Sequence, residues 1–144
     1  MKITVIGLGL IGGSMALDLK RTGFATEIIG VDNNEQHLQR ALELGIADRK
    51  ASLVEGVQQA DVVIVAIPVD KMVQTLPIIL DHISPFASVT DVGSTKKLIG
   101  DAVANHPNRG NYVAAHPMSG TENSGPDAAL SGLFEQKICI ICDH

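Results

Sequence analysis

Aromatic residues and long apolar runs are both scarce in this sequence of 144 residues. It contains three Phe, one Tyr and no Trp, so Val, Ile, Leu and Ala must build its core. A core of this kind is typical of strands that helices cover on both faces. No stretch approaches the ~20 apolar residues of a membrane-spanning helix, and we expect no membrane partner.

Clusters of basic residues are also lacking. Eleven Lys and Arg residues against sixteen Asp and Glu residues give a net charge of −5, and no stretch concentrates the positive charges. Nucleic acids and anionic membranes attract basic patches, so we expect neither as a partner. The N-terminal stretch MKITVIGLGLIGGS is rich in glycine and has no clean cleavage site, which argues against a signal peptide.

Cysteine occurs only twice, as Cys139 and Cys142 in KICIICDH, which has the pattern of a strand. Residues three apart on a strand point to opposite faces of a sheet, so this pair suits neither a metal ion nor a disulfide. We therefore expect no metal, and we expect both cysteines to be small apolar residues in the reducing cytoplasm.

The apolar residues recur in a pattern of alternating strands and helices. Strands are predicted at residues 2–6, 27–31, 61–67, 87–90, 112–115 and 137–141. Helices are predicted at residues 10–21, 34–44, 52–59, 70–83 and 95–104, with a helix or turn at 127–134. Pro77 lies inside one predicted helix and should kink or divide it.

This alternation predicts an α/β fold of the Rossmann type. The sheet should be mostly parallel and doubly wound, with right-handed crossovers and helices on both faces. The chain has the length of one domain, and we expect residues 1–144 to form a single dinucleotide-binding domain.

A glycine motif, G-x-G-x-x-G, follows the first predicted strand and opens the first predicted helix. Gly7 permits the tight turn, and Gly9 lets a pyrophosphate approach bare backbone. Gly12 allows close packing of helix and strand, while the helix N-terminus, with Leu10 and Ile11, presents free N–H groups to an anion. The alternative is a glycine-rich turn that binds no ligand.

Asp32 lies at the end of the second predicted strand, twenty residues after Gly12. A carboxylate there can accept hydrogen bonds from both ribose hydroxyls and would repel a 2′-phosphate, so NAD is favoured over NADP. Without the glycine motif, Asp32 would read equally well as a turn or helix-capping residue. Ile67 and Pro68, at the end of the central predicted strand, and Ser94 are also expected to bind the cofactor.

Two later segments narrow the function: DVGSTK at residues 91–96, between a strand and a helix, and HPMSGTENSG at residues 116–125. Together with GLGLIGGS near the N-terminus, they resemble the prephenate/arogenate dehydrogenase family of tyrosine biosynthesis. The resemblance covers essentially the whole chain, in order and at suitable spacings. Its most specific part is H-P-M-x-G-T-E.

The resemblance implies an NAD-dependent oxidative decarboxylation of prephenate to 4-hydroxyphenylpyruvate. His116 matches the catalytic histidine, which would accept the proton of the substrate's 4-hydroxyl group. Ser94 matches a serine that orients this imidazole beside the nicotinamide and the substrate. Glu122 matches a polar position at the substrate mouth, and Lys96 matches the motif without an evident chemical role.

Each of these residues also has a simpler interpretation. Ser94 can cap the helix that begins near Thr95, a histidine before proline can be a loop residue, and Glu122 can be an exposed loop carboxylate. The sequence indicates no partner for the other four histidines, and each is expected to be a surface residue: His37, His82, His106 and His144.

The resemblance also implies partners. Members of the family continue into a helical domain that forms a homodimer and supplies an arginine for the substrate's carboxylates. Without that domain we expect this chain to bind NAD, to turn over prephenate or arogenate weakly or not at all, and to self-associate through an exposed apolar surface. Two alternatives remain open: another Rossmann dehydrogenase of a small carboxylated substrate, and an NAD-binding module without catalysis.

Overall fold

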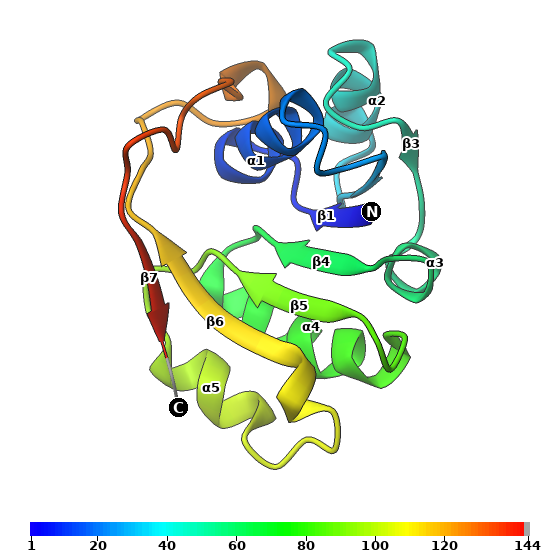
Figure 1. Cartoon of the computed structure of the whole chain (residues 1–144), viewed down its shortest axis with the longest axis vertical. Coiled ribbons are helices and arrows are strands. Elements are labelled where there is room, and N and C mark those ends of the chain that lie inside the picture. Colours follow the sequence, from blue (N-terminus) through cyan, green and yellow to red (C-terminus); the bar gives the residue numbers. More distant parts are fainter. Residues whose placement is uncertain (143–144) are drawn as a thin grey trace.

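The computed structural model describes residues 1–142, and seven strands of that range form one mixed sheet (Figure 1). The strand order is β3-β2-β1-β4-β5-β6-β7; β1 to β6 are parallel, and β7 is antiparallel to β6. The strands are β1 (Lys2–Ile6), β2 (Glu27–Val31), β3 (Arg49–Lys50), β4 (Val62–Val65), β5 (Ser88–Asp91), β6 (Tyr112–Pro117) and β7 (Cys139–Cys142).

Helices cover both faces of this sheet. The α-helices are α1 (Leu10–Arg21), α2 (Glu35–Glu43), α3 (Leu53–Gln58), α4 (Val69–His82) and α5 (Lys97–Val103). Short 3₁₀ turns occur at Arg109–Asn111 and Pro126–Ala128. Helices α1 and α2 pack on one face and α3, α4 and α5 on the other, which is the doubly wound arrangement predicted from the sequence.

Two apolar clusters show why the elements pack in this way. On β4, Val63 and Val65 belong to the cluster with α3, α4 and α5, whereas Ile64 belongs to the cluster with α1 and α2. Because alternate side chains of a strand point to opposite faces, a central strand of Val and Ile is buried on both. Met72 and Leu76 of α4 are almost inaccessible to solvent, as the helical spacing predicts.

Capping residues fix the turn between β2 and α2. The side chain of Asn34 accepts hydrogen bonds from the backbone N–H groups of Gln36 and His37, and this capping starts α2 at Glu35. Asp32 and Asn33 are thereby held in a short turn at the carboxyl end of β2, at the edge of the sheet where ligands of such folds bind.

Several sequence predictions differ from the structure. The last residues of the predicted strand at 112–115 continue in β6 to Pro117, so His116 lies in a strand that pairs with β7 and not in a loop. The sequence prediction missed the two-residue strand β3. Helix α4 runs through Pro77 as one element, so the proline does not divide it.

The histidines and cysteines are partly as predicted. The ring of His82 hydrogen-bonds the carbonyl of Ile78, and His106 pairs with Asp81, two partners that the sequence did not indicate. Cys139 and Cys142 are free thiols, the first exposed and the second half-buried. The expectation for His144 lies outside the described residues.

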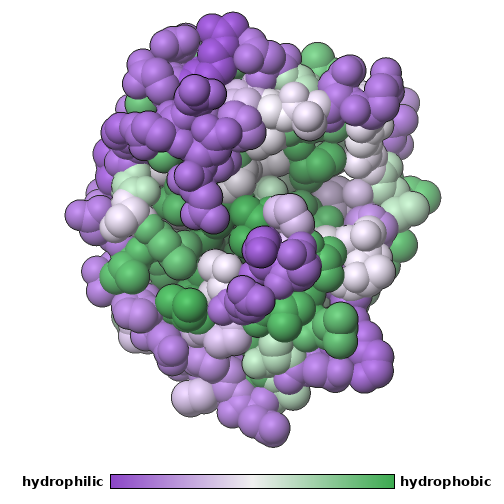
Figure 2. Space-filling model, turned by 180° about the vertical axis from the view of Figure 1, so that it is seen from behind, coloured by the Kyte–Doolittle hydropathy of each residue, from purple (hydrophilic) through white to green (hydrophobic). Residues whose placement is uncertain are grey.

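The surface is polar at one end and mixed elsewhere. Figure 2 shows polar side chains at the top of the molecule, the end at which α2 lies in Figure 1, and apolar side chains across the middle.

Within residues 1–142, no helix combines the length and the apolar character that crossing a bilayer requires.

Candidate functional site

A pocket of about 910 Å³ lies at the carboxyl ends of β1, β2 and β4. In doubly wound sheets this is the position of the ligand, because the crossovers on either side of β1 leave on opposite faces. The pocket is lined by predicted cofactor residues from three segments: Gly7, Gly9, Asp32, Ile67 and Pro68.

The three glycines of the motif are needed for different physical reasons. Gly7 has a φ of 91°, and a Cβ on it would collide with the backbone of Ala66. A Cβ on Gly12 would collide with the carbonyl of Gly7, so both residues are needed for packing. Gly9 has an ordinary φ of −80°, and its hypothetical Cβ would meet only the backbone nitrogen of Gly125, at 3.9 Å. Neither conformation nor packing requires a glycine there, whereas close approach of a phosphate does.

Asp32 is a structural as well as a candidate binding residue. One carboxylate oxygen accepts the backbone N–H of Leu8 at 3.0 Å, and the other accepts that of Asn34 at 2.9 Å. The carboxylate therefore ties the glycine turn to the β2–α2 turn and still lines the pocket. His37 lies beside it, with 3.9 Å between Nδ1 and Oδ2, a partner that the sequence did not indicate.

Residues of α3 and α4 line the same pocket, and the sequence prediction missed them. They are Leu53, Lys71, Gln74 and Thr75. Lys71 places a positive charge at this pocket, whereas the β2–α2 turn that also lines it contains no Lys or Arg. The polar first turns of the helix after β4 could have indicated this, since that helix starts at the same edge of the sheet.

A second pocket, of about 420 Å³, adjoins the first through shared Ala66, Ile67 and Pro68. It is lined by Ser94 from the β5–α5 connection and by His116 from β6. The structure thus brings together two residues that are twenty-two positions apart in the sequence. Among the described residues, no hydrogen bond joins their side chains.

Of the other predicted site residues, Ile11 lines the second pocket. Leu10 and Gly12 lie outside both linings and are buried in α1. Glu122 is exposed in the loop that follows β6. Helix α5 begins at Lys97 with Lys96 as its N-cap, so Ser94 does not cap that helix.

A buried polar network lies beneath the second pocket. The Asp91 carboxylate is inaccessible to solvent and accepts hydrogen bonds from the Tyr112 hydroxyl, at 2.7 Å, the Gly93 N–H, at 2.9 Å, and the Lys96 ammonium. Lys96 also donates to the carbonyl of Ala115, the residue before His116. Lys96 therefore ties the connection that carries Ser94 to the strand that carries His116.

Comparison with known proteins now identifies the family. Residues 15–144 match the family described as prephenate dehydrogenase, nucleotide-binding domain. The chain belongs to this family. It is 40% identical to a prephenate dehydrogenase of Bacillus subtilis over 98% of its own length and 39% of that protein's.

Solved structures of the family agree with this assignment. The chain matches an arogenate dehydrogenase of Synechocystis with a TM-score of 0.87 at 34% identity, over 98% of this chain and 49% of that one. It matches a prephenate dehydrogenase of Aquifex aeolicus, solved with hydroxyphenyl propionate and NAD+, with a TM-score of 0.85 at 34% identity, over 100% of this chain and 51% of that one. The chain spans about two fifths of the curated relatives, 39% and 41% of their lengths.

Proposed function

We propose that this chain is the NAD-binding and proton-accepting part of a dehydrogenase that oxidatively decarboxylates prephenate or arogenate. The observation that carries the proposal is the shared wall of the two pockets, formed by Ala66, Ile67 and Pro68. A dinucleotide with its adenosine near Asp32 and its pyrophosphate at Gly9 would place its nicotinamide end toward Ser94 and His116.

The residues of the first pocket fit NAD. Asp32 offers carboxylate oxygens to ribose hydroxyls, and Gly9 leaves the N-terminus of α1 open to the pyrophosphate. NAD bound there would supply the acceptor for the hydride of the substrate's ring carbon. The proton of the 4-hydroxyl group would be handled by side chains of this chain.

His116 would accept the proton of the substrate's 4-hydroxyl group as that carbon becomes a carbonyl. Loss of the ring carboxylate as CO₂ then leaves an aromatic ring. Ser94 would hydrogen-bond the imidazole and orient it toward the hydroxyl, and Glu122 would contact the substrate at the mouth. Lys96 acts indirectly, because it holds the backbone beside His116.

The domain and partner assignments belong to this proposal as well. Residues 1–144 form one nucleotide-binding domain of a longer, cytoplasmic enzyme that dimerises through a helical domain. The length of the relatives supports a longer enzyme, since the matched region is 39% of one and 41% of the other. The small-molecule substrate is the only partner that the site itself indicates.

The first test is calorimetric titration of this chain with NAD and with NADP. We expect NAD to bind at least about tenfold more tightly, because a 2′-phosphate would face the Asp32 carboxylate. In Asp32→Asn this preference should shrink to less than about threefold. Asparagine keeps the shape and one oxygen acceptor, so the hydrogen bond to Leu8 or to Asn34 can persist.

The matched control is Asp101→Asn, which removes the same charge from exposed α5 and should leave both affinities unchanged. A folded wild-type chain that binds neither nucleotide would contradict the proposal. A preference for NADP would contradict the role of Asp32.

The second test concerns His116 and is made in the full-length enzyme with prephenate. His116→Asn should lower kcat by about 10²–10⁴-fold, because the hydroxyl proton loses its acceptor, while the affinity for NAD stays unchanged. His82→Asn is the control, since the hydrogen bond that His82 forms within residues 1–142 is to the carbonyl of Ile78 in its own helix. Equal activity of His116→Asn and wild type would remove His116 from the mechanism.

A further inference from the structure

The chain between β6 and β7, which we call the return segment (residues 118–138), does not take the short way back to the sheet. In Figure 1 it leaves β6, passes to the top of the molecule beside α1 and returns along the edge to β7. Its first part, residues 119–125, is the site loop that carries Glu122. Its middle part, residues 126–136, lies against α1.

Gly13 of α1 fits the return segment sterically. Its backbone N–H already donates to the carbonyl of Gly9 at 2.8 Å, so it is not free for a ligand. A Cβ on Gly13 would lie 2.8 Å from the Cβ of Ala129, closer than real side chains approach. The glycine after the dinucleotide motif therefore makes room for the return segment.

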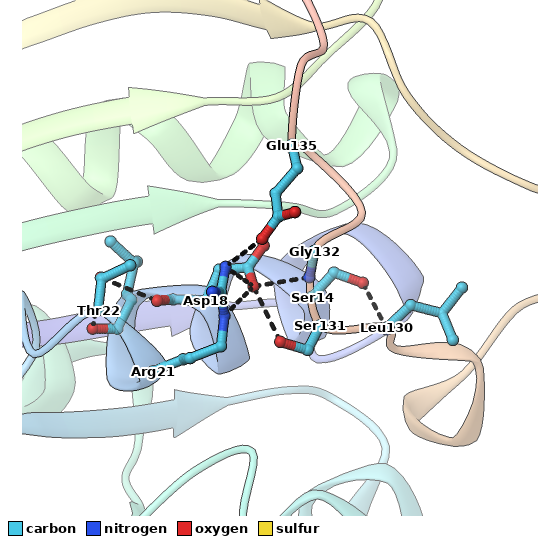
Figure 3. Close-up of polar contacts among 9 residues, drawn as sticks. Ser14, Asp18, Arg21, Thr22, Leu130, Ser131, Gly132 and Glu135 are labelled. Carbon is cyan, nitrogen blue, oxygen red and sulfur yellow. Dashed lines mark hydrogen bonds and ion pairs between the residues drawn. The ribbon is translucent and has the colours of Figure 1, made fainter.

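Two polar side chains of α1 hold the segment at this position (Figure 3). The buried hydroxyl of Ser14 donates to the carbonyl of Leu10 and accepts the backbone N–H of Leu130 at 2.9 Å. The Asp18 carboxylate accepts the N–H of Gly132 at 2.7 Å and the hydroxyl of Ser131 at 3.1 Å. These contacts join residues more than a hundred positions apart.

Outer ion pairs extend the same contact. Arg21 binds Glu135 at 2.7 Å, and Arg40 of α2 binds Asp127 at 2.6 Å. All four partners are exposed, so these pairs add little by themselves. They show that both helices beside the glycine turn face the segment.

The site loop passes beside the glycine turn and α2, next to the first pocket and outside its lining. The backbone nitrogen of Gly125 is 3.9 Å from where a Cβ of Gly9 would be, and a Cβ on Gly120 would lie 4.0 Å from Ile11. A Cβ on Gly125 would lie 3.9 Å from Nε2 of His37. The loop therefore passes beside the residues at which the pyrophosphate would enter.

We propose that Gly13, Ser14 and Asp18 are positioning residues that hold the site loop as an outer wall of the dinucleotide site. This inference rests on the proposed NAD binding. In a chain whose return segment leaves α1, the loop is in place only part of the time. The apparent affinity for NAD is then reduced in proportion to the fraction of molecules in which the loop is in place.

The decisive variant is Gly13→Ala. Its new methyl group pushes the segment off α1, while alanine suits the helix better than glycine, so the fold is retained. We expect the affinity for NAD to fall at least about fivefold and hydrogen exchange to rise at residues 119–136 alone. The double variant Gly13→Ala with Ala129→Gly removes the collision and should recover the wild-type affinity within about twofold.

Asp18 provides an independent test by the same titration. Asp18→Ala removes the acceptor of Gly132 and Ser131 and should weaken NAD binding at least about threefold, whereas Asp18→Asn keeps an oxygen and should retain most of it. Lys20→Gln is the control, because Lys20 lies on the same helix but pairs with Asp48 and does not touch the segment.

The outcomes separate the two proposals. If the wild-type chain binds NAD and Gly13→Ala binds it with the same affinity, this inference is overturned and the proposed function stands. Loss of affinity that Ala129→Gly fails to restore would also overturn it, since the collision would not be the cause. A folded wild-type chain without NAD binding would overturn both.

Discussion

Asp91 is the most deeply buried charged residue of the chain that the structure describes, with 1% of its surface exposed. Its two oxygens accept hydrogen bonds from a hydroxyl, a backbone N–H and an ammonium group, so the charge is paired inside the protein. A buried carboxylate without such partners would cost several kcal/mol. Tyr112 is the neutral partner, and burial together with the hydrogen bond to Asp91 raises the pKa of Tyr112 well above its usual value.

The raised pKa of Tyr112 gives a prediction at the residue scale. A group whose pKa is higher in the folded state stabilises the fold below its unfolded pKa, about 10, and loses that contribution as the pH rises toward the folded value. Because the sequence has one Tyr and no Trp, the near-ultraviolet absorbance of tyrosinate reports this residue alone. We expect no tyrosinate signal until the chain unfolds in alkali.

The control is Tyr112→Phe, which removes the signal and should weaken the dependence of the unfolding midpoint on pH above about 10. Tyrosinate that forms near its ordinary pKa while the fold is intact would contradict the buried hydrogen bond to Asp91.

At the scale of the elements, the site depends on how two strand ends are joined. The β5–α5 connection carries Ser94, and the end of β6 carries His116. The Lys96 ammonium binds Asp91 at the end of β5 and the Ala115 carbonyl of β6. The side chain of Lys96 is 10% exposed. A single buried cation therefore sets the relative position of two elements that line the second pocket.

Replacing that cation should be costly. Lys96→Met leaves the Asp91 carboxylate buried beside an apolar chain, and we expect the free energy of unfolding to fall by about 3–5 kcal/mol, measured by urea titration. The adjacent variant Lys97→Met loses only an exposed pair with Asp101 and should unfold at the wild-type urea concentration. Similar midpoints for both variants would show that the buried pair contributes little.

At the scale of the whole molecule, the two edges of the sheet differ. One edge is β3, two residues long and made of Arg49 and Lys50, which discourages pairing with another strand. The other edge, within the described residues, is β7. Ile141 of this strand is 70% exposed, and Ile138, the residue before the strand begins, is 72% exposed. An apolar edge strand of this kind favours association with another surface.

This asymmetry predicts self-association of the chain through β7. Sedimentation velocity should show an average mass that rises with concentration, and Ile141→Lys should weaken the rise, because it places a charge on the edge. Phe86→Lys is the matched control, since Phe86 is 95% exposed but lies in the turn before β5. Equal association by all three proteins would exclude the β7 edge as the contact.

The sequence determined the elements that form through local physics. The bounds of β1, α1 and β2 follow from β-branched runs, helical spacing and glycine stops, and the predicted bounds coincide with those of the structure. The glycine motif and Asp32 were located by spacing along adjacent elements. The mostly parallel, doubly wound fold followed from alternation, and the family from three short motifs.

Tertiary structure decided what depends on contacts between distant residues. The strand that includes His116 is longer than predicted because β7 pairs with it, and Lys71 reaches the first pocket because α4 starts at the same sheet edge. The structural roles of Gly13 and Ser14 become evident only because residues 129 and 130 lie against them in the folded chain. No local sequence pattern predicts such pairs of residues. The two residues of each pair are far apart in the sequence, and only folding brings them into contact.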